Sequence, residues 1–407
     1  MTANAGGTGA SEPAQPALLR DLNERTVLET IRRLRGVNRA EVARQTGLSK
    51  PTVSLALRTL EDNGLVRPVE VERTGRSGIL FEAVPDAALA AGIEVTGTEV
   101  RGVAVDLDGR PVARAAAASQ CLEGADAVYD AVRSCADQLV ASLPAGRSLE
   151  CAVVGTAGIL DPVTGVVTQA GAAHALDGSV PVEEVGDRLG VPVEVYNDVD
   201  LAALGERADG AARELDDFAV LWVGPGIGAA LVLDGRLHRG VRGAAGEVSG
   251  VPFAAAVAAN GGTPHEFTAA GPTEQAVAEL AARLSADGVS SRVGALHDVV
   301  SVLDAALLDD PLGRRVAEEM AGWVSWYVAS IAAVVDPRMV VLSGPLGSHE
   351  SLLALVQDQL TGLLHAPVQV VASKLGDASV LVGAAAVARR NAADLVFSRR
   401  VLDRGPA

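Results

Sequence analysis

The feature that most constrains the fold is a pattern that occurs twice, about 130 residues apart. Residues 91–110 read AGIEVTGTEVRGVAVDLDGR, and residues 218–236 read FAVLWVGPGIGAALVLDGR. In each, a strand leads into a glycine-containing turn, a second strand and an Asp-Gly-Arg turn, after which a third strand is expected. The duplication predicts a two-lobed α/β fold with a ligand cleft between the lobes. Each glycine turn is either a phosphate-binding loop or only a turn.

Residues 18–85 have a different pattern, that of three helices and a hairpin. Apolar residues at helical spacing predict a first helix that ends near Gly36. Asn38 can cap a short second helix, and Glu41 can reach back to complete a capping box. Gly47 suits the left-handed conformation that ends this second helix.

A third helix follows Ser49, which can cap it, and Pro51 is tolerated in its first turn. Val53, Leu57 and Leu60 share one face of this helix and are expected to be buried. The opposite face and the N-terminal end would then enter the major groove as a recognition helix. The DNA contacts predicted for the helical part are Arg39, Ser49, Lys50, Thr52, Ser54 and Arg58.

Residues 65–72 and 79–84 predict two strands around a tight turn, and this wing would place Arg73 and Arg76 at phosphates or in a minor groove. Three-helix units also serve as protein-contact modules, but the charge distribution favours DNA. Residues 18–85 contain 12 Arg or Lys and 9 Asp or Glu, whereas residues 86–407 contain 22 and 41. An acidic body repels DNA, so the basic segment alone is expected to dock on double-stranded operator DNA.

Composition argues against several other classes of protein. The three cysteines, Cys121, Cys135 and Cys151, lack the spacing of a disulfide framework or a zinc site and are expected to be buried thiols. Residues 1–17 are rich in Gly, Ala and Pro, lack the basic start of a signal peptide and are expected to be disordered. The most apolar stretch, residues 323–335, is too short to span a bilayer. We therefore expect a cytoplasmic protein without a membrane segment.

Three segments of the body carry candidate ligand groups. Asn197 and Asp198 end a buried-looking strand, where a carboxylate can bind or deprotonate a sugar hydroxyl, although Asp198 could equally be a helix N-cap. Glu247 follows a run of small residues on a tight loop, where its carboxylate could accept two hydroxyls of a pyranose. Residues 334–347 form an apolar strand running into a glycine turn, which either lies against a nucleotide or closes a sheet.

Taken together, these segments resemble the ROK family of repressors and sugar kinases, from about Leu18 to Arg390. The matching segments are residues 22–28, 39–54, 64–66, 195–206, 224–228, 233–240 and 245–248, all in family order. The resemblance implies a winged helix-turn-helix head, of α+β class, on an α/β body with the actin-like, ribonuclease H-like fold of sugar kinases. It also implies a homodimer or homotetramer.

The domain boundaries expected from this resemblance begin with the head at 18–85 and the body at 88–395. Within the body, the small lobe comprises residues 88–205 plus the C-terminal helix, and the large lobe comprises residues 206–384. Residues 396–407 are expected to form a solvated tail.

The resemblance also implies roles for individual residues of the body. Asp198 matches the catalytic base of the kinases, Glu247 matches a sugar-binding carboxylate, and Glu266 matches a further family glutamate. His174 lies near the position of a sugar-contacting Asn, although a lone His there is more often a surface or packing residue. The predicted sugar site is Asn197, Asp198, Glu247, Glu266 and His174.

Departures from the kinase pattern decide between kinase and sensor. The first phosphate loop begins with Glu94 and has the branched Thr96, where the kinases have Asp and Gly. In the second loop, Pro225 removes an N–H donor, and the family's cysteine-rich zinc motif is missing because residues 251–271 contain no Cys. We therefore expect no zinc, no ATP and no other cofactor. The degenerate loops comprise Gly97, Thr98, Gly224, Gly226 and Gly228.

The sequence thus predicts a sugar-responsive transcriptional regulator, a repressor of carbohydrate uptake or catabolism genes that is released when a sugar closes the cleft. Activation or dual control is left open, as are the sugar and the operator. One alternative is an active ATP-dependent sugar kinase carrying a DNA-binding head, with Asp198 as its catalytic residue. The other is a regulator that answers to a phosphosugar or a protein partner.

Overall fold

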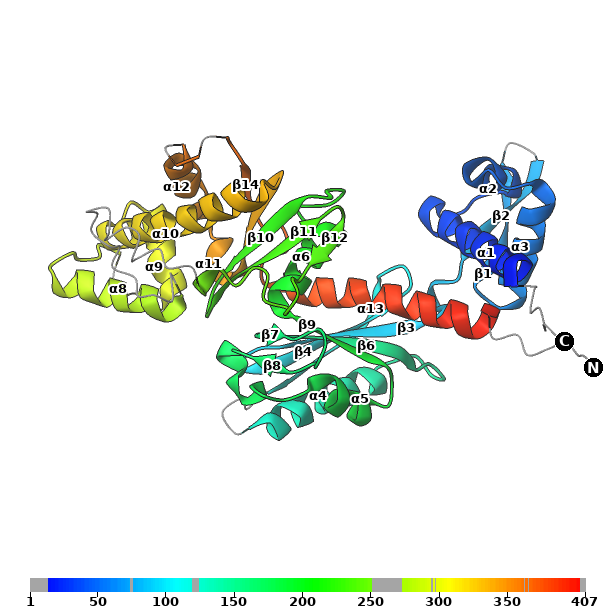
Figure 1. Cartoon of the computed structure of the whole chain (residues 1–407), viewed down its shortest axis with the longest axis horizontal. Helices are drawn as coiled ribbons and strands as arrows, with labels where there is room; N and C mark the ends of the chain where they lie inside the picture. Colours follow the sequence, from blue (N-terminus) through cyan, green and yellow to red (C-terminus); the bar gives the residue numbers. More distant parts are fainter. Residues whose placement is uncertain are drawn as a thin grey trace, which may run out of the picture. The chain divides into compact units, whose positions relative to one another are not determined.

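The structure, a computed structural model, describes residues 14–73, 76–118, 124–250, 273–293, 296, 298–361, 363–364 and 366–402 (Figure 1). The chain divides into two compact units. The head unit contains the residues up to 90, residues 105–110 and the residues from 389 onward, and the body unit contains residues 91–104 and 111–388.

The head unit is a winged helix-turn-helix, as predicted. Its first helix begins at Ala14, inside the segment predicted to be disordered, because Pro16 falls in the first turn, where a missing N–H costs no helical hydrogen bond. Strands β1 and β2 pair in register up to Arg73 opposite Arg76, so the paired strands extend further than predicted. The elements are α1 (Ala14–Leu34), α2 (Arg39–Thr46), α3 (Lys50–Asp62), β1 (Val66–Arg73) and β2 (Arg76–Ala83).

The helix ends of the head follow the sequence signals with one exception. Asn38 accepts a hydrogen bond from the Glu41 N–H, Gly47 is left-handed with φ 71°, and Ser49 accepts from the Thr52 N–H. The capping box is incomplete, because the Glu41 carboxylate accepts a hydrogen bond from Arg44 Nε at 2.9 Å instead of reaching back to residue 38. A charged donor one turn along the helix makes the stronger bond.

The body unit contains two five-stranded sheets with the same topology. In the small lobe the order is β5-β4-β3-β6-β9, and in the large lobe it is β12-β11-β10-β13-β14. Each is a three-strand meander whose first strand lies next to the fourth, so the duplication predicted from the repeated pattern is confirmed. The strands are β3 (Leu89–Val95), β4 (Glu99–Asp106), β5 (Pro111–Ala118), β6 (Leu149–Thr156), β9 (Val193–Asn197), β10 (Phe218–Val223), β11 (Ile227–Leu233), β12 (Arg236–His238), β13 (Met339–Ser343) and β14 (Gln369–Ala372).

Helices cover both faces of the large-lobe sheet (Figure 1). Val199 and Ala203 of α6 pack on one face against Phe218 and Val220. On the other face, Leu221 and its neighbours pack against α8, α9, α10 and α12. The helices of the body are α4 (Ala125–Ala141), α5 (Pro181–Leu189), α6 (Asp198–Asp209), α8 (Glu274–Ala286), α9 (Val299–Leu307), α10 (Pro311–Val335), α11 (Gly344–Gly347) and α12 (Glu350–Leu360). Shorter elements are η1 (Pro85–Ala87), β7 (Ile159–Leu160), β8 (Val167–Thr168), η2 (Gly171–Leu176), η3 (Val248–Gly250) and η4 (Gly376–Ala378).

The last helix, α13 (Ser379–Phe397), contributes its first half to the body unit and its second half to the head unit. In the body it crosses α6 backbone to backbone. A Cβ atom on Gly383 would lie 1.8 Å from the Leu201 carbonyl oxygen, and one on Gly205 would lie 2.3 Å from the Ser379 oxygen. Only glycine at both positions allows this close crossing.

The prediction that residues 396–407 form a solvated tail is wrong for the described part of that segment. A short π-helical turn, η5 (Ser398–Leu402), extends α13. Val396, Phe397 and Val401 are buried, and Arg400 donates hydrogen bonds to the carbonyl oxygens of Asn63 and Ala87 at 3.3 and 2.9 Å. The apolar side chains of Val396, Phe397 and Val401 are removed from water in the head unit, which favours an ordered segment here.

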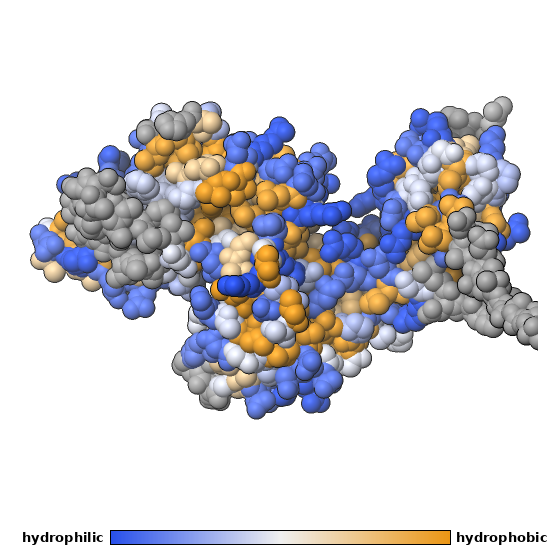
Figure 2. Space-filling view, viewed as in Figure 1, coloured by the Kyte–Doolittle hydropathy of each residue, from blue (hydrophilic) through white to orange (hydrophobic). Residues whose placement is uncertain are grey.

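Cys135 and Cys151 are free and buried, as predicted, and burial raises the pKa of their thiols to about 11 and about 12. Cys121 lies outside the described residues. None of the helices in the described part of the chain is long and apolar enough to cross a membrane. On the face shown in Figure 2, orange apolar residues are interrupted by blue hydrophilic ones throughout.

Candidate ligand cleft and DNA-binding surface

A cavity of about 560 Å³ lies between the two lobes of the body unit. Residues of the small-lobe turn 94–99 line one side, and residues of the large-lobe turn 225–229 line the other. The start of α6, Glu247, Pro345 and Asp377 also line the cavity. The two repeated glycine turns therefore face one cleft, as the sequence predicts. Its size is typical of small-molecule sites.

Asn197 and Asp198 enter the cleft from the junction of β9 and α6. Asn197 is the N-cap of α6, because its side-chain oxygen accepts from the Asp200 N–H at 3.0 Å, while its Nδ2 donates to the Gly158 oxygen at 3.0 Å. Both ends of this amide are thus occupied by structural bonds. Asp198 is in the first helical turn, with one oxygen accepting from the Val199 N–H at 2.8 Å and its side chain at the cavity wall.

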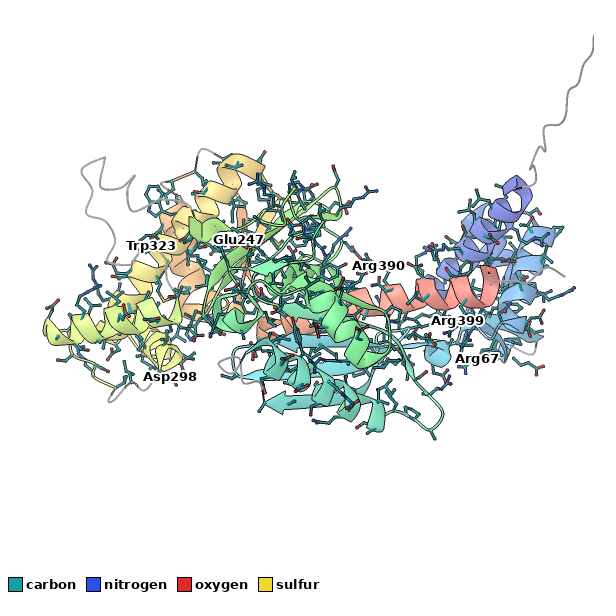
Figure 3. The ribbon with its side chains drawn as sticks, turned by 60° about the horizontal axis from the view of Figure 1, so that its bottom comes forward. Arg67, Glu247, Asp298, Trp323, Arg390 and Arg399 are labelled. Carbon is teal, nitrogen blue, oxygen red and sulfur yellow. The ribbon has the colours of Figure 1, made fainter. Side chains whose placement is uncertain are left out.

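Glu247 reaches the cleft because its loop is held tightly against β11. The Gly246 oxygen accepts from the Ala229 N–H at 2.8 Å, and Gly246 has φ 98°. A Cβ atom on Gly246 would lie 1.9 Å from the Ala229 oxygen, so no larger residue fits. The run of small residues before Glu247 therefore has the role that the sequence indicates. Figure 3 shows Glu247 beside the strands of the large lobe.

The cavity wall is strongly acidic. Burial raises the pKa of Asp198, and it also raises the pKa of Glu247, with the Asp198 charge adding to the effect. Glu94, with 4% of its surface exposed, has a pKa raised by burial to about 7, against an opposing effect of Arg101. A carboxyl group whose pKa is raised is more often protonated, and in that form it can both donate and accept hydrogen bonds. The carboxylates of the wall are Glu94, Glu99, Asp198, Glu247, Glu274 and Asp377.

Arg101 is the one basic side chain among the described residues that line the cavity. Its Nη2 lies 3.0 Å from Glu94 and its Nη1 lies 2.7 Å from Asp377, and Glu99 is 3.7 Å away. Burial alone would lower the pKa of Arg101, but the bonds to Asp377 and Glu94 raise it above the usual value. The sequence reasoning missed both Arg101 and Asp377. Arg101 closely follows Glu94 and Glu99 of the small-lobe turn, which was the available signal for it, whereas nothing near Asp377 in the sequence indicated its role.

A second ionic cluster, which was not predicted from the sequence, lies next to Asp198 but outside the cavity wall. Asp200 is buried, and its carboxylate lies 3.5 Å from Arg239, whose guanidinium stacks 4.0 Å from the centre of the Tyr196 ring. Burial raises the pKa of Asp200 to about 7, opposed by Arg239 and reinforced by Asp198 and Glu247. A buried acid next to two others costs free energy when ionised.

The first glycine turn uses several of its own backbone donors internally. The Thr96 hydroxyl oxygen accepts from the N–H groups of Thr98 and Glu99 at 3.4 and 3.1 Å, and the Thr96 N–H donates to the Glu99 oxygen at 2.9 Å. Gly97 and Thr98 line the cavity, but the turn offers a phosphate few donors.

The second glycine turn is likewise poor in donors. The Gly224 N–H donates to the Gly226 oxygen at 3.0 Å, and Pro225 has no N–H. Gly226 and Gly228 line the cavity, whereas Gly224 lies behind it against Pro345 and Trp222. Of the amides that could hold a phosphate in this turn, the one at position 224 is therefore engaged and the one at position 225 is absent.

The remaining predicted ligand residues are placed elsewhere or are not described. His174 is exposed in η2 and is not among the cavity residues, although its neighbours Gly171 and Ala173 are. Glu266 lies outside the described residues, as does the 251–271 segment of the missing zinc motif. Within the described ranges, no group of three His, Cys, Asp or Glu side chains could hold a metal ion.

On the head, the outer face of α3 carries the predicted DNA contacts. Lys50 and Arg58 are exposed and Thr52 and Ser54 are half-exposed, while Val53, Leu57 and Leu60 are buried as predicted. The Ser49 hydroxyl is 2.7 Å from the Thr52 hydroxyl, so both are oriented by the cap.

Arginines flank this recognition helix. Arg39 is exposed, and its guanidinium lies 5.2 Å from the centre of the Phe81 ring, which orients it. Arg73 and Arg76 belong to β1 and β2, but their side chains lie outside the described residues. Arg67 of β1, labelled in Figure 3, is 3.3 Å from Glu82 and was not among the predicted contacts.

The fold and the cleft define a class of proteins in which a helix-turn-helix head precedes a two-lobed body of the sugar-kinase type. Residues 90–391 match the ROK family, and residues 26–70 match the IclR helix-turn-helix domain. The chain belongs to the ROK family.

Similar proteins include both enzymes and regulators. The bifunctional enzyme NanE/NanK of Brucella suis is 33% identical over 208 residues, which are 50% of this chain and only 36% of the enzyme. The putative xylose repressor of Caldicellulosiruptor sp. is 26% identical over 390 residues, 91% of this chain and 96% of the repressor.

Two solved structures have the same fold. A ROK family transcriptional regulator, a homologue of the E. coli Mlc protein, aligns with a TM-score of 0.77 and 17% identity over 95% of this chain and 99% of its own. A ROK family glucokinase from Streptomyces griseus, in complex with glucose and AMPPNP, aligns with a TM-score of 0.60 and 25% identity over 74% of this chain and all of its own.

Proposed function

We propose that this protein is a transcriptional repressor that binds operator DNA through α3 and is released by a sugar or sugar derivative in the cleft. The observation that carries the proposal is the joint presence, in one chain, of an exposed cationic recognition helix and an acidic cleft with few free anion-binding amides. A relative that spans nearly the whole chain is named a putative xylose repressor, which agrees with this function.

The chemistry of the wall favours a neutral ligand rich in hydroxyl groups. Carboxyl groups whose pKa is raised by burial, as at Asp198 and Glu247, can accept hydroxyl hydrogen bonds and, when protonated, donate them. A sugar that leaves one of these buried groups unpaired loses about 1–3 kcal/mol per group. Such a cleft discriminates between sugars that differ in a single hydroxyl.

We further propose that the cleft binds its sugar without phosphorylating it and needs neither ATP nor zinc. The engaged N–H groups around Thr96, the proline at position 225 and the absence of Cys from residues 251–271 support this. Asp198, which matches the catalytic base of the kinases, would then act as a hydroxyl acceptor only.

Helix α13 offers a route from the ligand to the DNA-binding surface. Asp377 lines the cavity just before the helix begins, and the helix ends in the head unit. There Asp394 lies 2.9 Å from Arg25, and Arg400 donates to the oxygen of Asn63, the residue that caps the end of α3. A ligand that displaces Asp377 would shift one continuous helix. A bias of about 1–3 kcal/mol suffices for useful control.

The direct test is DNA binding with and without sugar. Fluorescence anisotropy with DNA from the promoter region of its own gene should show salt-dependent binding, and sugars that raise Tm in a thermal-shift screen should weaken it. In a homodimer, the two half-sites should repeat about 10 base pairs apart or at a multiple of that. The proposal is contradicted if the protein does not bind this DNA. It is also contradicted if none of the stabilising sugars changes the affinity for this DNA.

The kinase alternative is favoured by one observation, the position of Asp198 at the cavity wall. It predicts sugar-dependent consumption of ATP that Asp198→Asn abolishes, and absence of turnover with a panel of hexoses, pentoses and amino sugars rejects it. A regulator answering to a phosphosugar or protein partner is tested by calorimetry. Direct binding of a free sugar, lost in Glu247→Ala, counts against that reading.

A further inference from the structure

The two halves of the cleft differ in chemistry. One half carries the carboxylates of Asp198 and Glu247, which suit the hydroxyls of a sugar ring. The other half is bounded by Trp222, Pro225 and Pro345, three flat or rigid apolar side chains. At about 560 Å³ the cavity falls in the range that takes ligands larger than a single pyranose.

The Trp222 indole is held in one orientation by two glycine turns. A Cβ atom on Gly344 would lie 3.0 Å from indole atoms Cδ2 and Cε2, and one on Gly224 would lie 3.2 Å from Nε1. Pro345 packs against the Gly224 turn so closely that a Cβ atom on Gly224 would lie only 2.9 Å from Pro345 Cδ. The indole therefore covers the glycine turn after β13, the surface that the sequence left open as a place for a nucleotide. Its half-exposed part lines the cavity.

An anion is a poor occupant of this apolar half. The adjoining turn uses the Gly224 N–H internally, and Glu274 of the cavity wall is tied to the same turn, because its N–H donates to the Gly224 oxygen at 2.9 Å. A phosphate here would meet a carboxylate and no free arginine among the described cavity residues, since Arg101 is paired with Glu94 and Asp377. A neutral group with an apolar face and a few hydroxyls meets no such repulsion.

We propose that the half of the cleft formed by Trp222, Pro225 and Pro345 is a second carbohydrate subsite, so that the ligand is a glycoside of at least two rings. The C–H face of the second ring packs on the indole, and its hydroxyls reach Glu274. The first ring binds Asp198 and Glu247. This inference rests on the proposed function and specifies its ligand class: a neutral disaccharide or longer oligosaccharide. Aromatic side chains bring large contact area in a fixed geometry, which suits this role.

The test is calorimetry on the full-length protein with matched pairs of ligands: glucose with cellobiose and with maltose, and xylose with xylobiose. At least one disaccharide should bind ten-fold or more tightly than its monosaccharide. Trp222→Leu should reduce that advantage to less than three-fold and leave the affinity for the monosaccharide within two-fold. Trp326→Phe, a tryptophan of α10 outside the cavity wall, is the matched control and should keep the advantage.

A second measurement covers the case in which Trp222→Leu does not fold. Trp222 is the one tryptophan at the cavity wall, so the preferred disaccharide should shift or quench the tryptophan emission of the wild-type protein more than its monosaccharide does. Equal affinity for both members of every pair, or competition by a non-hydrolysable ATP analogue, overturns the second subsite while leaving a sugar-responsive repressor intact. If no carbohydrate binds at all, the proposed function itself fails.

Discussion

The raised pKa of Glu94 can be measured through the pH dependence of the free energy of unfolding. The residue is 4% exposed, and burial raises the pKa of its carboxyl group from 4.5 to about 7 despite Arg101 at 3.0 Å. Because the folded pKa is raised, its stabilising contribution is fully present below pH 4.5 and is lost as the pH rises through 7. The whole shift corresponds to about 3 kcal/mol.

The perturbation is Glu94→Gln, which cannot titrate. About 2 kcal/mol of the effect should fall between pH 5.5 and 8.5. Over that range the free energy of unfolding of the wild type should therefore drop by about 2 kcal/mol relative to the variant. Urea unfolding followed by tryptophan emission measures this for the body unit alone, since Trp222, Trp323 and Trp326 all belong to it.

Glu99→Gln is the matched control, because Glu99 belongs to the same turn but its side chain is 45% exposed. It should follow the pH dependence of the wild type. Wild type and Glu94→Gln curves that run parallel from pH 5.5 to 8.5 would refute the reasoning, since Glu94 would then have the same proton affinity in the folded and unfolded states.

Three further predictions concern the two functional surfaces. Lys50→Ala and Arg58→Ala should each weaken operator binding by about 1–3 kcal/mol without changing Tm, as anisotropy at several salt concentrations would show; unaltered affinity would remove α3 from the interface. Gly246→Ala, whose Cβ would lie 1.9 Å from the Ala229 oxygen, should lower sugar affinity at least ten-fold in calorimetry and spare DNA binding without sugar. Arg400→Ala removes two hydrogen bonds to backbone oxygens and should reduce the sugar response of DNA binding, and a full response in this variant argues against transmission through α13.

Much of the architecture follows from local patterns in the sequence. The caps at Asn38 and Ser49, the left-handed Gly47 and the buried face of α3 depend on residues that are close neighbours along the chain, so the sequence specifies them directly. The repeated strand–turn–strand pattern likewise determines the duplicated sheets and brings two glycine turns to one cleft. The carboxylates of Asp198 and Glu247 are predictable for the same reason, since Asp198 directly follows a buried strand and Glu247 follows a run of small residues.

Contacts between distant segments were decided by the tertiary structure alone. Arg101 and Asp377 are 276 residues apart, and only the packing of the last helix brings them together. The same packing buries Val396 and Val401, which in sequence look like part of a polar tail. From the sequence, Trp222 is simply one more apolar residue of a strand. Its role depends on the glycine turn at 344, which packs against its indole only in the folded protein. Local hydrogen bonds and periodicity depend on neighbours along the chain, whereas burial and charge pairing depend on which surfaces meet once the chain has folded.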